Sequence, residues 1–266
     1  MKVTVIGGGS TYTPELIQGF LERIDSLPVS ELWLMDIDPQ RLEIVGGFAR
    51  RMVGARSEAE GRPFFTVHLT DDLKAAIQGC RYVITQLRVG GMQARREDEY
   101  LGRRHGLIGQ ETTGVGGMAK ALRTIPVVLN VAATMRSLAP DALLVNFTNP
   151  SGLVTEALSR YASDVPSVGV CNAAITAKME MLKGLKERRG IEVIPERAHL
   201  NTLGLNHLTW HRGLEVDGEE LWPQVMETYL EELATESEPA WDLETCLLYT
   251  SPSPRDLSTS RMPSSA

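Results

Sequence analysis

Two hydrophobic patterns alternate along the first 170 residues of the chain. Short runs rich in β-branched residues predict buried strands, and stretches with apolar residues three and four positions apart predict helices. The predicted strands are KVTVIGG (2–8), ELWLMDID (31–38), FFTVHLT (64–70), RYVITQL (81–87), ALLVNFTNP (142–150) and VPSVGV (165–170). The predicted helices are TPELIQGFLERI (13–24), PQRLEIVGGFARRMV (39–53), DDLKAAIQG (71–79) and SGLVTEALSRYA (151–162).

Mostly apolar strands that alternate with helices are typical of a parallel sheet covered by helices on both faces. The predicted fold class is therefore α/β, with a Rossmann-like, doubly wound parallel sheet. The pattern becomes irregular at residues 201–210, and Asp217-Gly218 predicts a hairpin turn. We expect a first domain over residues 1–196 and the beginning of an α+β domain over residues 197–245.

The segment LLYTSPSPRDLSTSRMPSSA (247–266) is rich in Ser and Pro and has no periodicity. Such a segment cannot bury enough apolar surface to offset the entropy lost on ordering, so we expect disorder. It also resembles translated sequencing-adapter read-through. We therefore expect the native sequence to stop near Glu244 or Thr245, with residues 246–266 as a non-native tail.

Charge and cysteine content narrow the function classes. A formal net charge of −7 argues against a nucleic-acid partner, because phosphate binding requires clustered Lys and Arg. The three cysteines, Cys80, Cys171 and Cys246, are odd in number and irregularly spaced, which favours free thiols in a reducing compartment. Neither a secretory signal nor an apolar run of about 18 residues occurs, so we expect a cytoplasmic protein without a membrane partner.

A glycine-rich turn, GGGSTY (7–12), separates the first predicted strand from the first helix. It supplies the first two glycines of the G-x-G-x-x-G pattern. Gly7 allows the tight turn, and Gly9 lets the backbone approach a pyrophosphate at the helix N-terminus. Asp36, at the end of the second strand, is placed to accept hydrogen bonds from an adenosine ribose. The predicted NAD-binding residues are Gly7, Gly9, Ser10, Thr11 and Asp36; the alternative is a similar turn that binds another ligand.

Five sequence motifs, the first of which includes the glycine-rich turn, occur in register along the chain. They are GGGSTYTPEL (7–16), RVGGMQARREDE (88–99), GQETTGVGG (109–117), NFTNPSG (146–152), and the pair VCNAA (170–174) with LGLNH (203–207). Together they resemble the NAD- and metal-dependent glycosidases of glycoside hydrolase family 4, over most of the chain up to about Trp210. Such NAD-dependent enzymes are an exception to the usual two-carboxylate scheme of glycoside hydrolysis, so the resemblance implies that no paired carboxylates flank the scissile bond.

The resemblance implies a site. Cys171 and His207 correspond to the two protein ligands of a divalent metal, usually manganese. The catalytic positions are Glu111, whose carboxylate raises the basicity of a catalytic tyrosine, and Asn172. Substrate-binding positions are Arg95, which we expect at a 6-phosphate, and Asn149 and Asn172, which hydrogen-bond the sugar.

The same residues have other interpretations when each is taken by itself. Cys171 follows a predicted buried strand and suits a small core residue. Asn149-Pro150 is a turn signal. Arg95 lies in ARREDE, which also fits a solvated helix with internal ion pairs. A loop histidine such as His207 is commonly a surface residue, and it is the joint register that favours the metal site.

The subclass that the sequence resembles most is the 6-phospho-β-glucosidases, in which asparagine follows the metal-binding cysteine, as Asn172 does here. Relatives that act on α-linked 6-phospho substrates tend to carry aspartate there, and those acting on unphosphorylated α-glycosides histidine. Ala173-Ala174 departs from the pattern, because close relatives usually have a proline two residues after the asparagine. An α-glycosidase of the same family is therefore an alternative.

The implied reaction is NAD-assisted hydrolysis of a 6-phospho-β-glucoside such as cellobiose 6-phosphate or an aryl glucoside. Oxidation at C3 of the sugar acidifies the C2 proton, and elimination, water addition and reduction follow. None of the tyrosines at positions 12, 82, 100, 161, 229 and 249 lies in a context that matches the family's base. We therefore expect this chain to be inactive, and its parent protein to be a homo-oligomer. The alternatives are an NAD-dependent 2-hydroxy-acid dehydrogenase of the lactate/malate type and a regulatory NAD-binding module.

Overall fold

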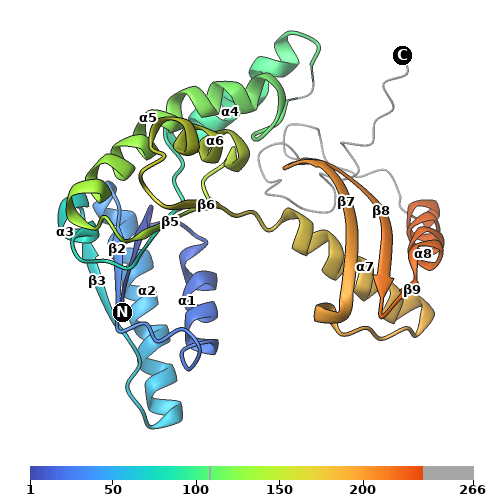
Figure 1. Ribbon diagram of the computed structural model, residues 1–266, viewed down its shortest axis with the longest axis horizontal. Helices are drawn as coiled ribbons and strands as arrows, with labels where there is room; N and C mark the ends of the chain where they lie inside the picture. Colours follow the sequence, from blue (N-terminus) through green and yellow to red (C-terminus); the bar gives the residue numbers. More distant parts are fainter. Residues whose placement is uncertain (108, 236–266) are drawn as a thin grey trace.

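The computed structural model describes residues 1–107 and 109–235. Six parallel strands form the main sheet in the order β3-β2-β1-β4-β5-β6 (Figure 1). The strands are β1 (Lys2–Ile6), β2 (Glu31–Met35), β3 (Thr66–Thr70), β4 (Tyr82–Thr85), β5 (Leu143–Asn146) and β6 (Ser167–Gly169). This order confirms the predicted doubly wound sheet, because the strand order reverses between β1 and β4.

Helices cover the sheet on both faces. One apolar cluster packs α1 (Thr13–Glu22) and α2 (Pro39–Glu60) against β1 and β2, with Ile17, Leu32 and Leu34 fully buried. Another packs α3 (Leu73–Ile77), α5 (Gly114–Leu138) and α6 (Ser151–Tyr161) against the strands through Met135, Leu144 and Leu158. Burial on both faces explains why the strands are continuous apolar runs.

The predicted helix starts follow ordinary capping chemistry. Asp38 caps α2 by accepting a hydrogen bond from the Arg41 N–H, and Asp72 caps α3 in the same way through Lys74. Pro14 lies in the first turn of α1, as expected. Helix α2 continues seven residues past its predicted end, to Glu60, because its exposed C-terminal half is rich in good helix formers and ends at left-handed Gly61.

Two helices of this unit were not predicted from the apolar pattern. They are α4 (Gly91–Arg104) and α5, which pack against each other. The buried residues of α4 are Arg95, Asp98, Glu99 and Gly102, so its inward face is polar and gives no hydrophobic periodicity. On α4, buried charge therefore replaces the usual apolar stripe, whereas α5 buries Val128, Val131, Ala132 and Met135.

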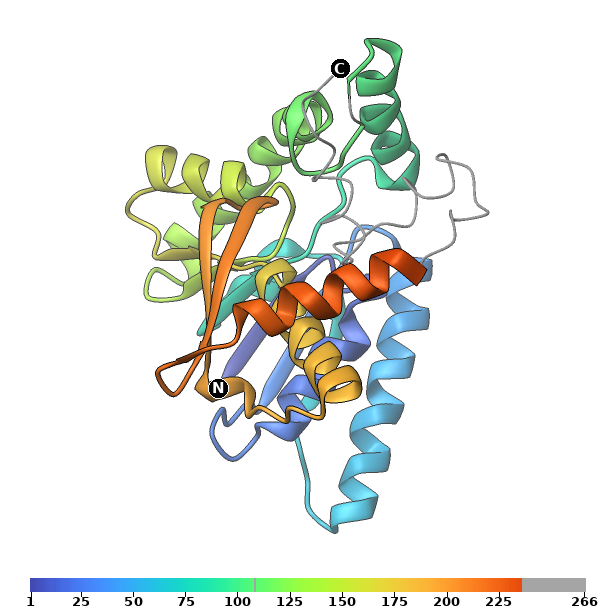
Figure 2. The same cartoon turned by 90° about the vertical axis from the view of Figure 1, so that its right-hand side faces the viewer.

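A second group of elements follows β6. It consists of α7 (Ala173–Arg189), the short helix η1 (Pro195–Arg197), β7 (Ala198–Leu205), β8 (Leu208–Val216), β9 (Glu219–Glu220) and α8 (Trp222–Thr235). Strands β7, β8 and β9 form an antiparallel sheet, and α8 lies across α7 beside it (Figure 2). Leu182 and Leu185 of α7 share an apolar cluster with Leu214. Helix α7 thus precedes the predicted boundary at residue 197 yet packs with elements that follow it.

The hairpin predicted at Asp217-Gly218 joins β8 to β9. Both residues have positive φ, 53° and 87°, as the favoured two-residue hairpin turns require. Residues 236–266, which include Cys246 and the predicted tail, lie outside the described residues. Within the described chain, no helix is both long and apolar enough to cross a membrane.

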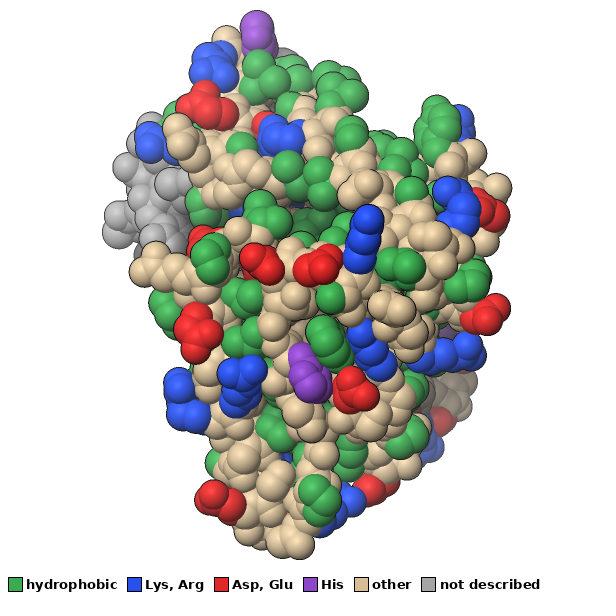
Figure 3. Space-filling model, turned by 90° about the vertical axis from the view of Figure 1, so that its left-hand side faces the viewer, with side chains coloured by type: hydrophobic (Ala, Val, Ile, Leu, Met, Phe, Trp, Pro, Cys, Tyr) green, Lys and Arg blue, Asp and Glu red, His purple; other side chains and the backbone are tan. Residues whose placement is uncertain are grey.

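Figure 3 shows one face of the molecule, the side on the left of Figure 1. Basic and acidic side chains are interspersed over this face, with hydrophobic side chains between them. Mixed charges of this kind form a solvated surface and not a single-sign field on this face.

Candidate functional site

The glycine-rich turn lies between β1 and α1, at the carboxyl edge of the sheet. Gly7 has φ of 92°, and a Cβ added there would lie 2.6 Å from the backbone oxygen of Gln86. A Cβ on Gly9 would lie 2.8 Å from Oδ2 of Asp36. A side chain at Gly7 would meet backbone, and one at Gly9 would displace the Asp36 carboxylate, so the turn is bare of side chains where we predict a pyrophosphate.

Asp36 has a structural role that the sequence did not reveal. Its Oδ2 accepts a hydrogen bond from the Gly9 N–H at 2.8 Å, and its Oδ1 accepts one from the Asp38 N–H at 3.0 Å. The side chain is half-buried, and each carboxylate oxygen has a second lone pair. Asp36 thus fixes the turn and retains acceptor capacity for the predicted ribose contact.

The other predicted nucleotide residues also lie in this turn. The Ser10 Oγ accepts a hydrogen bond from the Tyr12 N–H at 3.2 Å, and Thr11 is exposed. Thr13 begins α1 and donates from its hydroxyl to the Gly8 carbonyl at 2.9 Å. The glycines thus lead directly into the N-terminus of α1, which is the end of a helix that favours a phosphate.

A buried polar network holds the loop that follows β5. Asn146, fully buried at the end of β5, accepts from the Thr85 hydroxyl at 3.0 Å and from the Thr148 N–H at 3.2 Å. The Leu87 N–H donates to the Thr148 hydroxyl at 2.9 Å, which ties this loop to the one after β4. The network positions half-buried Asn149, whose bond to Pro150 is cis.

Cys171 and His207 meet although 36 residues separate them in the sequence. The Cys171 Sγ lies 3.4 Å from the His207 Nε2, and both residues are half-buried. Cys171 follows β6, which is the edge strand of the sheet and leaves Val168 exposed, so the strand is not the buried one that the sequence predicts. His207 lies at the turn between β7 and β8, with φ of 61°.

The separation of these two atoms fits two ligands of one divalent ion. Metal–sulfur and metal–nitrogen bonds of about 2.3 and 2.1 Å place the two atoms about 3.1 to 3.6 Å apart at ordinary coordination angles. No group of three or more His, Cys, Asp and Glu side chains that could hold a metal occurs among the described residues. A metal held by Cys171 and His207 would therefore leave coordination positions open for other ligands.

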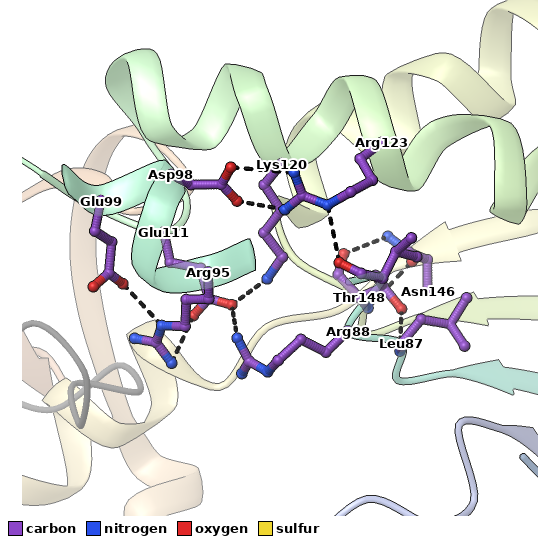
Figure 4. Close-up of polar contacts among 11 residues, drawn as sticks. Leu87, Arg88, Arg95, Asp98, Glu99, Glu111, Lys120, Arg123, Asn146 and Thr148 are labelled. Carbon is purple, nitrogen blue, oxygen red and sulfur yellow. Dashed lines mark hydrogen bonds and ion pairs between the residues drawn. The ribbon is translucent and has the colours of Figure 1, made fainter. Parts of the chain in front are cut away.

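Buried charges gather between α4, α5 and the loop before α5 (Figure 4). Glu111 accepts from the Arg88 Nη1 at 2.5 Å and from the Lys120 Nζ, both through Oε1. Its Oε2 lies 3.2 Å from the Arg95 Nη1. Arg95 also donates through Nε to Glu99 at 2.8 Å. We call Arg88, Arg95, Glu99, Glu111 and Lys120 the charge cluster.

Two glycines allow the loop that carries Glu111 to lie against α5. A Cβ on Gly116 would lie 2.3 Å from the Gln110 carbonyl oxygen, and one on Gly117 would lie 2.4 Å from the Thr112 carbonyl oxygen. Both contacts are with backbone, which cannot give way as a side chain can. The GVGG sequence therefore allows Glu111 to reach the side chain of Lys120.

A second ion pair braces the same two helices. The Arg123 Nη2 lies 2.5 Å from the Asp98 Oδ2, and the Arg123 Nε donates to the Val89 carbonyl at 2.9 Å. Arg123 is one turn beyond Lys120 on α5, and Asp98 lies on α4. The pair links α4 to α5 through side chains outside the charge cluster.

The charge cluster shifts the titration of its members. Burial raises the pKa of the Glu111 carboxyl, but Lys120, Arg95 and Arg88 together hold it below its usual value. Burial lowers the pKa of Lys120 to about 8, against the opposing attraction of Glu111. Burial also lowers the pKa of His207. The negative charge of Glu111 opposes this shift, and the positive charge of Lys120 adds to it. The cluster and the Cys171–His207 pair therefore lie close enough to interact electrostatically.

The predicted substrate residues occupy different positions. Arg95 is 4% exposed and bound to two carboxylates, so it belongs to a buried ion-pair network and not to a solvated helix face. Asn172 is half-buried and immediately precedes α7, next to Cys171. Asn149 lies in the loop after β5.

Sequence reasoning missed Arg88, Glu99 and Lys120. Burial raises the pKa of the Glu99 carboxyl, and its Oε2 has no hydrogen-bond partner among the described residues. Lys120 is 3% exposed on a helix that the apolar pattern did not predict. The available signal was spacing, because Lys120 comes three and four residues after Gly117 and Gly116 and so shares their face of a helix.

Comparison with known proteins identifies the fold and the family. The model of the family described as "Family 4 glycosyl hydrolase" matches residues 2–187. The chain belongs to glycosyl hydrolase family 4. The match includes the glycine-rich turn, the charge cluster and Cys171, and ends within α7.

Family 4 relatives share much of the sequence. A probable 6-phospho-beta-glucosidase of Bacillus subtilis is 47% identical over 229 residues, which cover 85% of this chain and 49% of the relative. The 6-phospho-beta-glucosidase BglT of Thermotoga maritima is 36% identical over 255 residues, covering 95% and 58%. The chain spans about half the length of the curated relatives it matches.

Solved structures agree with this membership. The 6-phospho-beta glucosidase from Thermotoga maritima, solved with manganese, NAD⁺ and glucose-6-phosphate, superposes with a TM-score of 0.77 at 37% identity. The match covers 91% of this chain and 55% of that one. Lactate dehydrogenase from Eimeria maxima superposes with a TM-score of 0.57 at 15% identity, a likeness of fold alone.

Proposed function

We propose that this family 4 chain is the nucleotide- and metal-binding part of a 6-phospho-β-glucosidase that requires NAD and a divalent metal. The substrate would be a small phosphorylated disaccharide, such as cellobiose 6-phosphate, or an aryl 6-phospho-β-glucoside. The proposal is favoured by the relatives named as 6-phospho-β-glucosidases and by a solved relative that holds manganese, NAD⁺ and glucose-6-phosphate.

The observation that carries the proposal is the 3.4 Å approach of the Cys171 Sγ to the His207 Nε2. A dehydrogenase of the lactate/malate type needs no such pair, whereas a sugar that binds a metal through two hydroxyl groups needs a sparsely ligated ion. A thiolate and an imidazole are softer donors than manganese prefers, so iron, cobalt and nickel are also compatible with this donor set. Manganese is favoured by the solved relative.

When bound, NAD would accept and later return a hydride at C3 of the sugar, and the metal would act as a Lewis acid toward the O2 and O3 oxygens. The resulting C3 ketone acidifies the C2 proton, whose removal allows elimination of the leaving group from C1, followed by addition of water. Gly7 and Gly9 would leave space for the pyrophosphate. Ser10, Thr11 and Asp36 would hydrogen-bond the nucleotide, with Asp36 favouring an unphosphorylated ribose.

The remaining residues would orient the sugar. Asn149 and Asn172 would donate and accept hydrogen bonds at its hydroxyl groups. Arg95 would contribute positive charge toward the 6-phosphate, although its guanidinium already binds Glu99 and Glu111. Glu111, kept ionised by its neighbours, would accept a hydrogen bond from the tyrosine that removes the C2 proton and raise its basicity.

We further propose that this chain does not release product by itself, because its tyrosines do not match the position of that base. We also propose that the parent protein is a homo-oligomer. Asn172 directly after Cys171 favours a β-linked 6-phospho substrate over the α-linked substrates of other family 4 relatives.

The test combines binding with activity. We expect calorimetry to detect NAD⁺ binding, and Mn²⁺ binding that EDTA abolishes. With both present, incubation with p-nitrophenyl 6-phospho-β-glucoside is expected to release no p-nitrophenol. The matched control substrates are the α-linked 6-phospho compound and the unphosphorylated β-glucoside. In each reaction, the absorbance of p-nitrophenol and that of NADH are recorded together.

Three outcomes would contradict the proposal. Accumulation of NADH from lactate or malate, unaffected by EDTA, would favour the dehydrogenase alternative. Release of p-nitrophenol by this chain would show that a base for the C2 proton lies within it. NAD⁺ binding without any Mn²⁺ binding would favour a regulatory nucleotide-binding module.

A further inference from the structure

Lys120 occupies an unusual place on α5. The inward face of this helix is formed by small and apolar residues, among them Gly116, Gly117, Ala121 and Val128, yet Lys120 lies among them and is 3% exposed. Removing an ammonium group from water costs several kcal/mol unless a counter-charge compensates for it. A methionine would fill the same volume without this cost, so packing does not account for the lysine.

The compensating group is Glu111, and the contact is specific to one oxygen. Lys120 and Arg88 both donate to Oε1 of Glu111, whereas Oε2 has Arg95 at 3.2 Å. A carboxylate offers about four lone-pair positions, two on each oxygen. Lys120 and Arg88 occupy both lone-pair positions of Oε1. Oε2 retains one lone-pair position that can accept a further hydrogen bond.

We propose that Lys120 is a positioning residue, whose ammonium group fixes Oε1 of Glu111 and presents Oε2, ionised, to a hydroxyl donor in the site. The inference deepens the proposed function and rests on it for the identity of that donor, the phenol of a catalytic base. The orientation of Glu111 itself rests on the contacts within this chain.

The charges around Lys120 support this assignment. Its charged neighbours are Glu111 from the loop before α5, Arg88 from the loop after β4, and Arg95 from α4, and the titratable side chain of His207 is near enough to interact with it. Three cations thus surround two carboxylates, Glu111 and Glu99, and Lys120 exerts the largest of the attractions that keep Glu111 ionised. Without Lys120, the buried carboxylate would rely on half-exposed Arg88 and on Arg95, which Glu99 shares.

The experiment follows the Glu111 side-chain carboxyl of the whole chain by ¹³C NMR through a pH titration. The signal is assigned by its absence in Glu111→Gln. We expect Lys120→Met to raise the titration midpoint of Glu111 by roughly one pH unit or more, as removal of a close opposite charge does. The matched control is Arg123→Met, which breaks the other ion pair between α4 and α5 and is expected to leave the Glu111 midpoint unchanged.

An unchanged Glu111 midpoint in Lys120→Met, or an equal rise in Arg123→Met, would overturn the inference, because the effect of Lys120 would then be structural. If Lys120→Met does not fold, the ¹⁵N signal of the Lys120 ammonium in Glu111→Gln provides the same test. Loss of Glu111 is expected to lower the Lys120 midpoint below its wild-type value near 8. No change there would equally overturn the inference.

These measurements need no NAD, metal or sugar. A coupled Glu111–Lys120 pair in a chain that fails to bind NAD⁺ or Mn²⁺ would support the positioning role and count against the proposed function. If Glu111 and Lys120 are uncoupled in a chain that binds NAD⁺ and Mn²⁺, the result would support the proposed function and count against the positioning role.

Discussion

Two regions of the molecule are built in different ways. They are the glycine-rich turn and the place where Cys171 meets His207, which we call the junction. Gly7, Gly9 and Asp36 come from one β–α–β stretch, and hydrogen bonds within that stretch hold them. Cys171 follows the edge strand of the parallel sheet, whereas His207 lies at the tip of an antiparallel hairpin in the second group of elements. The first region depends on local geometry, and the second depends on how two separately packed groups of elements meet.

The two regions also differ in how much buried charge they contain. The turn uses backbone groups and one half-buried carboxylate, whose cost of desolvation is small. The junction lies beside five charged side chains, of which Arg95, Glu99, Glu111 and Lys120 are almost fully buried. Buried ion pairs contribute little net stability, because desolvation offsets their attraction. The junction therefore depends on mutual compensation of charge, so that loss of one charged member should be more damaging there than in the turn.

The largest expected effect is that of Glu111→Ala. Arg88, Arg95 and Lys120 would lose a shared acceptor, and breaking a buried pair by removing one partner costs about 3–5 kcal/mol of unfolding free energy. Urea denaturation would measure the loss. The control is Glu156→Ala, which breaks the exposed pair with Arg160 and should change stability by at most about 0.5 kcal/mol. Equal small losses would mean that the charge cluster is effectively solvated.

A smaller effect is expected from pH. The pKa of Lys120 in the folded chain is about 8, below its ordinary 10.5, so between these values the unfolded chain binds more protons at this site. The free energy of unfolding attributable to Lys120 should therefore rise with pH from 8 to 10.5, by at most about 1.4 kcal/mol per pH unit. The measurement is the difference between wild type and Lys120→Met in urea at pH 8, 9 and 10; a difference that falls with pH would contradict it.

The smallest effect concerns the nucleotide side. Asp36→Ala should weaken NAD⁺ binding about five- to tenfold, roughly the 1 kcal/mol of one hydrogen bond to ribose. Asp38→Ala, two residues away, removes the N-cap of α2 and should cost about 1 kcal/mol of stability while leaving NAD⁺ affinity unchanged. Calorimetric titration of both variants separates the two roles. Equal loss of affinity would mean that Asp36 acts only by holding the turn.

The contrast also explains what the sequence could predict. The strands of the sheet, the glycine turn and the Asp217-Gly218 hairpin follow from patterns a few residues long and occur at the expected places, although β6 is an exposed edge strand and not a buried one. Helix α4 was not predicted because buried charge replaces its apolar stripe, and α5 because Gly116, Gly117 and Lys120 interrupt the stripe near its start. Hydrophobic periodicity cannot detect a helix whose inward face is polar.

The site residues likewise differ in whether a local sequence pattern could identify them. Gly7 and Gly9 could be identified from their spacing within the glycine-rich turn. The pairing of Cys171 with His207 came only through resemblance to a family, because no local pattern links residues 36 positions apart. Lys120 and Arg88 were missed, since a lysine after GVGG and an arginine after a strand are ordinary surface residues until the fold brings them to Glu111.

In the proposed metal site, Cys171 and His207 together bind one divalent metal at the junction. Titration of the chain with Co²⁺ tests it directly, because a thiolate ligand gives a sulfur-to-cobalt charge-transfer absorption. We expect wild type and His199→Ala, which alters an exposed histidine of β7, to show this absorption at one equivalent. Cys171→Ser should abolish it, and His207→Ala should weaken Co²⁺ binding at least about tenfold, as loss of one of two ligands requires. Absorption that persists in Cys171→Ser, or that is absent from wild type, would contradict the claim.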